Sequence, residues 1–143
     1  MTQENSSPKW FLIVSILALI WNLLGLMAFV SQVTMTAETI AQLPAAEQAL
    51  YQNIPLWATA AFAIAVGAGT LGCIVLLMKK SIAKIIFITS LIGVLVQNFH
   101  SFFVIDAMAV YGVTSIIMPL LVIVIGVTLI MLSQKAIDNQ WIN

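Results

Sequence analysis

Four apolar stretches, nearly free of charged side chains, constrain this chain more than any other feature of its sequence. They cover about residues 10–31, 56–78, 84–104 and 113–133. A helix rises ~1.5 Å per residue, so about 20 residues cross the ~30 Å hydrocarbon core of a bilayer. Because backbone polar groups in lipid must be hydrogen-bonded within their own segment, each stretch is predicted to be a helix. The predicted fold is all-α: a polytopic membrane protein with a bundle of four transmembrane helices.

The composition supports a single integral membrane domain over residues 1–143. Hydrophobic residues make up 62% of the chain and charged residues 7%, whereas a soluble domain carries about 25% charged residues. The first stretch is too long for a typical signal peptide and lacks a clear cleavage site, which favours a retained helix. A formal net charge of zero and the lack of a basic cluster argue against nucleic acid as a partner. The predicted partner is the lipid bilayer.

The lysines predict the orientation of the four helices. In a four-span topology, all five lysines fall on the side that carries both termini and the second connection. They are Lys9, Lys79, Lys80, Lys84 and Lys135. The other side carries only acidic residues. Since positive charge is retained in the cytoplasm, both termini are expected to be cytoplasmic.

The connection between the first two helices is the only long one. Thr36 is a suitable cap for a short helix over residues 37–43, and Pro44 is suited to start a second helix that ends near Gln52. This pattern predicts a short helical outer loop, although a loosely ordered loop fits equally well. The connection over residues 105–112 is predicted to be short.

The chain lacks the residues that several kinds of site require. Cys73 is the single cysteine and His100 the single histidine. A lone cysteine cannot form an intramolecular disulfide or a CxxC site, and a lone histidine argues against a haem or zinc site within one chain. No carboxylate lies inside a predicted span, so proton coupling through a buried acid has no candidate. The sequence predicts a protein that is not an enzyme, with no catalytic residues, cofactor or metal.

Polar residues inside the spans are the best candidates for a site, because polar groups are costly in hydrocarbon. Counting along the helices puts Asn22 and Gln97 at about the same depth, with Trp21 beside them. Pro119 lies near that level in the fourth helix, where proline would free a backbone carbonyl. His100 lies nearer the outer interface.

Two interpretations of this polar cluster remain open. Amides that donate and accept hydrogen bonds, together with an aromatic wall, would suit a neutral hydroxylated solute such as a sugar. The amides of Asn22 and Gln97 would otherwise link helices by hydrogen bonds, with Pro119 as a tolerated kink. The second interpretation is somewhat favoured, because interhelical amides are common.

The second helix is predicted to pack closely against a neighbour. Small residues recur along it at helical spacing, which lets two helix backbones approach each other. They are Ala61, Ala65, Gly69 and Gly72. The pattern does not distinguish a helix of the same chain from one of a second copy.

Residues along nearly the whole chain carry a resemblance to a known family. They are Trp21-Asn22-x-x-Gly25, Glu47-Gln48-Ala49-Leu50-Tyr51, Pro55-x-Trp57-Ala58, Gly69-x-x-Gly72-Cys73, Leu95-Val96-Gln97, His100 and Phe102-Phe103. With these the chain resembles a bacterial family of small four-helix inner-membrane proteins whose members are often labelled sugar transporters. The resemblance implies the four-helix architecture and a location in the bacterial inner membrane, and it carries over no functional residues.

Three classes of function follow from the sequence. The first is transport of a small neutral, sugar-like solute, which requires a homo-oligomer because four helices alone do not easily enclose a path. The second is an accessory or assembly subunit of a larger membrane complex. The third, a membrane enzyme acting on lipid, lacks a visible nucleophile, base or metal cluster. Transport is the working hypothesis.

Overall fold

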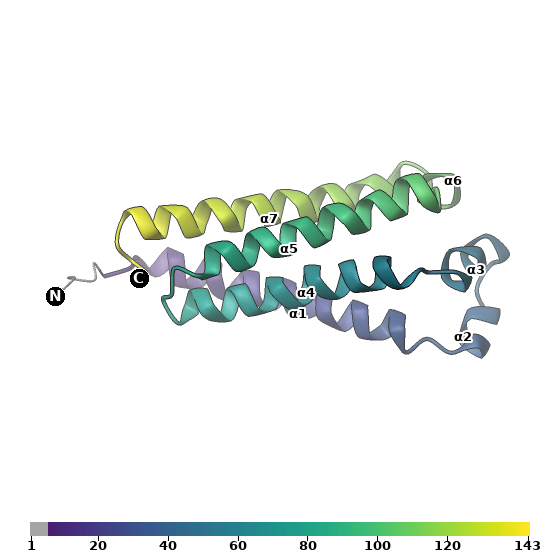
Figure 1. The fold of residues 1–143 in the computed structure, drawn as a ribbon, viewed down its shortest axis with the longest axis horizontal. Helices are drawn as coiled ribbons and strands as arrows, with labels where there is room; N and C mark the ends of the chain where they lie inside the picture. The colour runs from purple at the N-terminus through teal and green to yellow at the C-terminus, as the bar shows by residue number, and fades with distance from the viewer. Residues whose placement is uncertain (1–5) are drawn as a thin grey trace.

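The computed structural model describes residues 6–143, which form four long helices with short helices between them (Figure 1). The long helices are α1 (Lys9–Val33), α4 (Leu56–Leu77), α5 (Ala83–Phe99) with its π-helical extension η1 (His100–Val104), and α7 (Thr114–Asp138). Each is long and apolar enough to cross a membrane. The predicted all-α architecture with four membrane-spanning helices is therefore confirmed.

The bundle has two distinct ends. At one end, here called the terminal end, lie the start of α1, the α4–α5 connection and the end of α7 (Figure 1). At the other, the loop end, lie α2 (Ala37–Ala41), α3 (Ala45–Gln52) and α6 (Ala107–Tyr111). The five lysines belong to the terminal end, since they lie at the start of α1, in and just after the α4–α5 connection, and in the last turn of α7.

The loop end agrees with the predicted helical loop and refines its details. Thr36 caps α2, because its hydroxyl accepts a hydrogen bond from the Thr39 amide at 3.2 Å. Pro44 is the N-cap of α3 and not its first helical residue, so the predicted start is wrong by one position. The last connection also contains a helix, α6, which begins after Asp106 in a left-handed conformation with φ of 47°. α7 continues to Asp138, past its apolar stretch, because the helix extends beyond the hydrocarbon.

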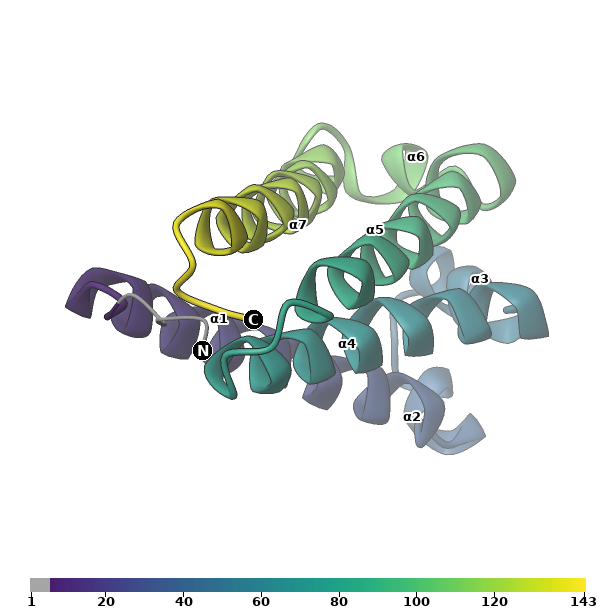
Figure 2. The ribbon, with the colours of Figure 1, turned by 60° about the vertical axis from the view of Figure 1, so that its left-hand side comes forward.

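The four long helices form two layers. Figures 1 and 2 show α1 beside α4 in one layer and α5 beside α7 in the other. α4 and α5 have the most extensive contact, followed by α1 with α4 and α5 with α7. The backbones of α1 and α7 do not pack along their lengths. These two helices therefore form the least closed side of the bundle.

The small residues of α4 let α5 approach closely. Ala61, Ala65, Gly69 and Gly72 are all buried. Gly93 of α5 faces the backbone of Ala61 and Ala65, and the Ser90 hydroxyl donates a 2.5 Å hydrogen bond to the Ala65 carbonyl. The helix that this stripe meets is therefore one of the same chain.

The dense core lies at the terminal end of the bundle. It includes Cys73, Leu76 and Phe87, all nearly inaccessible, with Phe11 and Ile142 from the two ends of the chain. The segment after α7 turns back over this core, because the Asn143 amide donates to the Lys79 carbonyl and the Asn143 carbonyl accepts from the Ser81 amide. This end of the bundle is thus filled by side chains, whereas cavities lie in the middle of the bundle and at the loop end.

Candidate functional site

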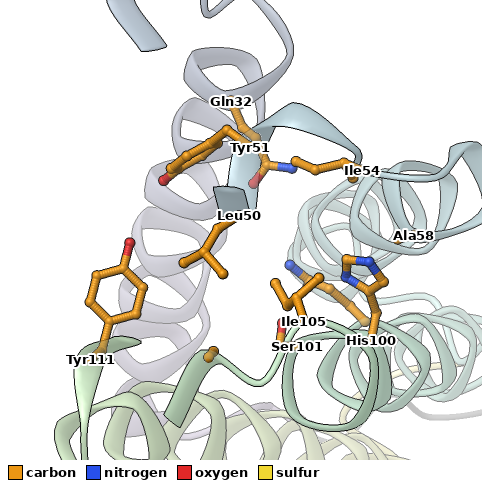
Figure 3. Close-up of a pocket in the computed structure, with 11 residues that line it drawn as sticks. Gln32, Leu50, Tyr51, Ile54, Ala58, His100, Ser101, Ile105 and Tyr111 are labelled. Carbon is orange, nitrogen blue, oxygen red and sulfur yellow. The ribbon is translucent and has the colours of Figure 1, made fainter. Parts of the chain in front are cut away.

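The loop end contains a small cavity, here called the outer pocket, of about 160 Å³ (Figure 3). Its polar lining comes from α1, α3, α5, η1 and α6, and its apolar lining includes Leu50, Ile54 and Ala58. The polar residues are Gln32, Tyr51, Gln97, His100, Ser101 and Tyr111. None of the residues that line the pocket is charged at neutral pH if His100 is neutral. The pocket therefore offers hydrogen bonds without a counter-charge.

His100 lines this pocket while being almost entirely buried, with 4% of its surface exposed. Its Nε2 atom is buried without a hydrogen-bond partner among residues 6–143. The ring packs edge-on against Trp57, with 5.2 Å between the ring centroids. A buried polar atom that lacks a partner costs free energy, so the packing around His100 has to offset this cost for the ring to stay beside the pocket.

A local irregularity of the backbone positions His100 and its neighbour Ser101. From His100 the helix widens into a π-turn, in which the Ile105 amide donates to the His100 carbonyl at 3.1 Å. π-turns are rare and occur frequently at functional sites, because they change the direction in which side chains point. The widened turn contains both His100 and Ser101, and both residues line the outer pocket.

Two tyrosines, the only ones in the chain, lie at the side of the pocket. The hydroxyl groups of Tyr51 and Tyr111 point toward each other in Figure 3. Partial burial raises the pKa of Tyr111 above its ordinary value, and the nearby Tyr51 and Glu47 raise it further. The Tyr111 hydroxyl therefore stays protonated at physiological pH and is able to donate a hydrogen bond.

Below the outer pocket, within the span region, lies a larger and mostly apolar cavity of about 370 Å³, here called the inner cavity. All four long helices line it, with Trp21, Phe62 and Phe87 as its aromatic residues. Asn22, Ser90 and Gln97 are its only residues with polar side chains. An apolar cavity of ~150 Å³ is already large enough to bind benzene, so this one has room for a substantial apolar group.

The helix packing around the inner cavity is weakest between α1 and α7. The other helix pairs are closed by close contacts: Gly93 against Ala65 between α4 and α5, and Gly126 against Leu91 between α5 and α7. α1 and α7 lack such packing, and each contributes several lining residues. In a bilayer this side would face the hydrocarbon.

The two cavities follow each other along the same helix faces. On three helices, residues four positions apart line the outer pocket and the inner cavity, respectively. These pairs are Gln32 and Ala28 on α1, Ala58 and Phe62 on α4, and Ser101 on η1 with Gln97 on α5. Four residues correspond to about one helical turn, ~5.4 Å. Gln97 lines both cavities and so marks their junction.

The structure brings together most of the site residues that were predicted from the sequence. Trp21, Asn22 and Gln97 line the inner cavity, and His100 joins Gln97 in the outer pocket. Pro119 lines neither cavity. It lies about 100° around α7 from Met118, which does line the inner cavity.

The side-chain amides of Asn22 and Gln97 have different surroundings. The Asn22 amide nitrogen donates to the Ala18 carbonyl at 2.9 Å and to the Cys73 sulfur at 3.4 Å, which links α1 to α4. No hydrogen bond joins Asn22 to Gln97 within residues 6–143. The interhelical interpretation therefore suits Asn22, while the Gln97 side chain remains available at the junction.

Sequence reasoning missed several residues of the outer pocket. Tyr51 entered only through the family resemblance, and Gln32, Ser101 and Tyr111 were not singled out as site residues. Gln32 follows Ala28, and Ser101 follows Gln97, by one helical turn, and this polar spacing is visible in the sequence. It points to a shared pocket only when the helices that carry these residues are known to face each other.

Comparisons with other proteins leave the site to be interpreted from its own geometry. No family model, no curated protein and no solved structure matches this chain. Within residues 6–143, no group of three or more His, Cys, Asp or Glu side chains lies close enough together to hold a metal ion.

Proposed function

We propose that the protein transports a small neutral, hydroxylated solute such as a sugar across the bacterial inner membrane. In this proposal it acts as a homo-oligomer, has no catalytic activity, and keeps both termini in the cytoplasm. The outer pocket then faces the external side, where the solute enters. The lysines at the terminal end support this orientation, since positive charge is retained in the cytoplasm.

The observation that carries the proposal is the uncharged polar lining of the outer pocket. Amide, hydroxyl and imidazole groups converge on it, and no lysine or carboxylate takes part. An ionic solute would lose its hydration there without gaining an opposite charge, which is costly. A neutral solute with several hydroxyl groups would instead exchange its hydrogen bonds to water for bonds to the amide and hydroxyl groups of the pocket.

The distribution of packing suggests how transport is gated. The outer pocket lies at the loop end, the inner cavity reaches down to Phe87, and the core around Leu76 and Phe11 closes the path at the terminal end. Such a state would accept a solute from one side only. Release on the other side requires this core to open, and a second copy beside α1 and α7 would shield the path from lipid.

The experiment that tests the proposal is uptake of radiolabelled neutral sugars and polyols into proteoliposomes that contain only this protein. Gln97→Leu removes the amide at the junction, and uptake is expected to fall by about tenfold or more, since a lost hydrogen bond in a dry site costs ~1–3 kcal/mol. Gln52→Leu removes an exposed amide outside both cavities and is the matched control. Absence of uptake by the wild-type protein, or equal uptake by both variants, would contradict the proposal.

An accessory role in a larger membrane complex is the second candidate. The observation that favours it is the low burial of α1. Its only buried residues are Phe11, Ser15 and Ala18, all in its terminal half. Toward the loop end, Leu23, Leu24 and Met27 are exposed. A helix that packs on α4 but buries so few of its side chains within its own chain is suited to pack against a partner subunit as well. Purification from native membranes in a mild detergent, as a complex of fixed stoichiometry with another membrane protein, would favour this role.

A further inference from the structure

We infer that the outer pocket and the inner cavity together bind one ligand, a single-chain amphiphile with an uncharged, hydrogen-bonding head and an apolar tail. The head occupies the outer pocket and the tail extends into the inner cavity. This inference deepens the proposed function, because it rests on the assignment of the outer pocket to a neutral hydroxylated group. It replaces a free, water-soluble sugar by a lipid-like molecule that carries such a group.

The first argument is the continuity of the two cavities. They share Gln97, and on three helices their linings are one turn apart. A compound that fills only the outer pocket would leave the larger cavity next to it empty. Empty space of this size forfeits the contacts of every side chain around it. One ligand that spans the junction would fill both.

The second argument is the abrupt change of polarity at the junction. On the outer side of Gln97 lie His100, Ser101 and two tyrosines; on the inner side the lining is almost wholly apolar. Apart from Gln97 at the junction, the polar side chains that reach the inner cavity already make hydrogen bonds within the protein. Ser90 donates to the Ala65 carbonyl, and Asn22 donates to Ala18 and Cys73. The inner cavity therefore matches a hydrocarbon chain better than a second hydroxylated group.

The third argument is access. We take the weakly packed side between α1 and α7 as the entrance to the inner cavity, because a bilayer would place acyl chains against it. A tail can enter sideways through this opening while its head stays at the level of the outer pocket. A water-soluble solute gains nothing from a lateral opening into lipid. The lack of charged residues in the outer pocket also excludes the phosphate of an ordinary phospholipid as a favoured head.

Photoaffinity labelling tests the inference with the full-length protein in phosphatidylcholine nanodiscs. The probe is an alkyl glucoside with a diazirine at the end of its chain, used below its critical micelle concentration. Labelled peptides are expected to contain the inner-cavity residues of α7, such as Val122 and Ile125. Unlabelled alkyl glucoside should compete, whereas methyl glucoside, alkyl sulfate and alkyltrimethylammonium should compete about tenfold less well or worse.

Two neighbouring positions on α7 provide a matched pair of variants. Val122 lines the inner cavity and Leu121 is exposed outside it. Val122→Trp should fill the cavity and abolish labelling, whereas Leu121→Trp adds the same side chain on the lipid-facing side and should leave labelling unchanged. Equal loss in both variants, each shown to be folded by its thermal transition, would overturn the tail assignment.

The competitors separate failure of this inference from failure of the proposed function. If methyl glucoside competes as well as the alkyl glucoside, the head alone suffices, so the solute proposal stands and the amphiphile is overturned. If alkyl sulfate competes equally, the site selects only a chain, and both proposals are overturned. If the label is spread over all lipid-facing surfaces and no sugar is taken up by proteoliposomes, both are likewise overturned.

Discussion

Gly93 on α5 lies against the backbone of Ala65 on α4, so that a Cβ built at position 93 would be 2.8 Å from the Ala65 amide nitrogen. Backbone atoms cannot rotate away as a side chain can. The distance between these two helices therefore depends on the hydrogen atom that glycine has in place of a methyl group. The Ser90–Ala65 hydrogen bond depends on the same short distance.

Gly93→Ala is accordingly expected to push α4 and α5 apart and to lower stability by about 1–3 kcal/mol, the usual cost of overpacking. Gly67→Ala is the matched control, since a Cβ at position 67 of α4 meets nothing within 4 Å. That change should be neutral or stabilising by up to about 1 kcal/mol, because alanine is the better helix former. Thermal unfolding in detergent measures both. Similar stability of the two variants would contradict the close approach.

A second prediction concerns Gly69 and Asn22. A Cβ at position 69 would overlap the Asn22 side-chain oxygen, so Gly69→Ala forces this amide to rotate and lose its hydrogen bond to Cys73. The expected cost is ~0.6–2 kcal/mol, as for other interhelical polar contacts. In an Asn22→Ala background there is no amide to displace, so Gly69→Ala should cost less. A double-mutant cycle should show a coupling of about 0.5 kcal/mol or more.

A double-mutant cycle that combines Gly69→Ala with Gln97→Ala is the control for the cycle with Asn22→Ala. Gln97 lines the inner cavity with Gly69, but it is not among the nearest neighbours of a Cβ at position 69. The effects of Gly69→Ala and Gln97→Ala should therefore add. Additive losses for the Asn22 cycle as well would mean that Asn22 and Gly69 are not in contact.

A third prediction uses the fact that the chain has only two tyrosines. In Tyr51→Phe, every tyrosinate signal comes from Tyr111, whose pKa is raised chiefly by partial burial. Its ultraviolet titration should therefore have a midpoint above the ~10 of free tyrosine. A midpoint at or below that value would contradict the position of Tyr111 beside the outer pocket.

The sign of the accompanying stability change follows from the same pKa. The unfolded chain loses the Tyr111 proton near ~10, whereas the folded protein keeps it to higher pH. The folded state is thus progressively destabilised as pH rises from ~10 through the raised pKa. Tyr111→Phe should remove this part of the pH dependence.

A fourth prediction concerns closure of the terminal end. Trp141 packs against Trp10 and Phe11, with ring centroids 5.6 and 5.5 Å apart. Trp141→Ala removes both pairs, each worth ~0.5–1.5 kcal/mol beyond its area, and should loosen the core beneath. Cys73, fully buried and the only cysteine, should then react faster with a membrane-permeable maleimide. Trp57→Ala, the same change at the loop end, should leave that rate unaltered.

A fifth prediction concerns orientation. Topology reporters fused at the N-terminus, at Lys80 and at the C-terminus should all read cytoplasmic, and one at Glu47 in α3 should read external. The start of α1, Lys80 and the end of α7 lie at the lysine-bearing terminal end, which is expected to be cytoplasmic. A cytoplasmic reading at Glu47 would overturn both the orientation and the side from which the solute is proposed to enter.

The sequence by itself determined those features that depend on local chemistry. The length and apolarity of a segment set its transfer into lipid, so the four spans are visible without a fold. Capping is equally local, and Thr36 marks the start of α2 for that reason. Helical spacing likewise put Asn22 and Gln97 at one depth, and both line the inner cavity.

Only the tertiary structure decided what lies between the helices. A cavity is space that side chains fail to fill, and its place depends on which helix pairs approach closely. Here Gly93 draws α4 and α5 together, whereas α1 and α7 lack an equivalent contact. The meeting of Tyr51 with Tyr111 is non-local in the same way. Residues from distant segments became one site because the helices carry them there, and no single stretch of sequence contains that information.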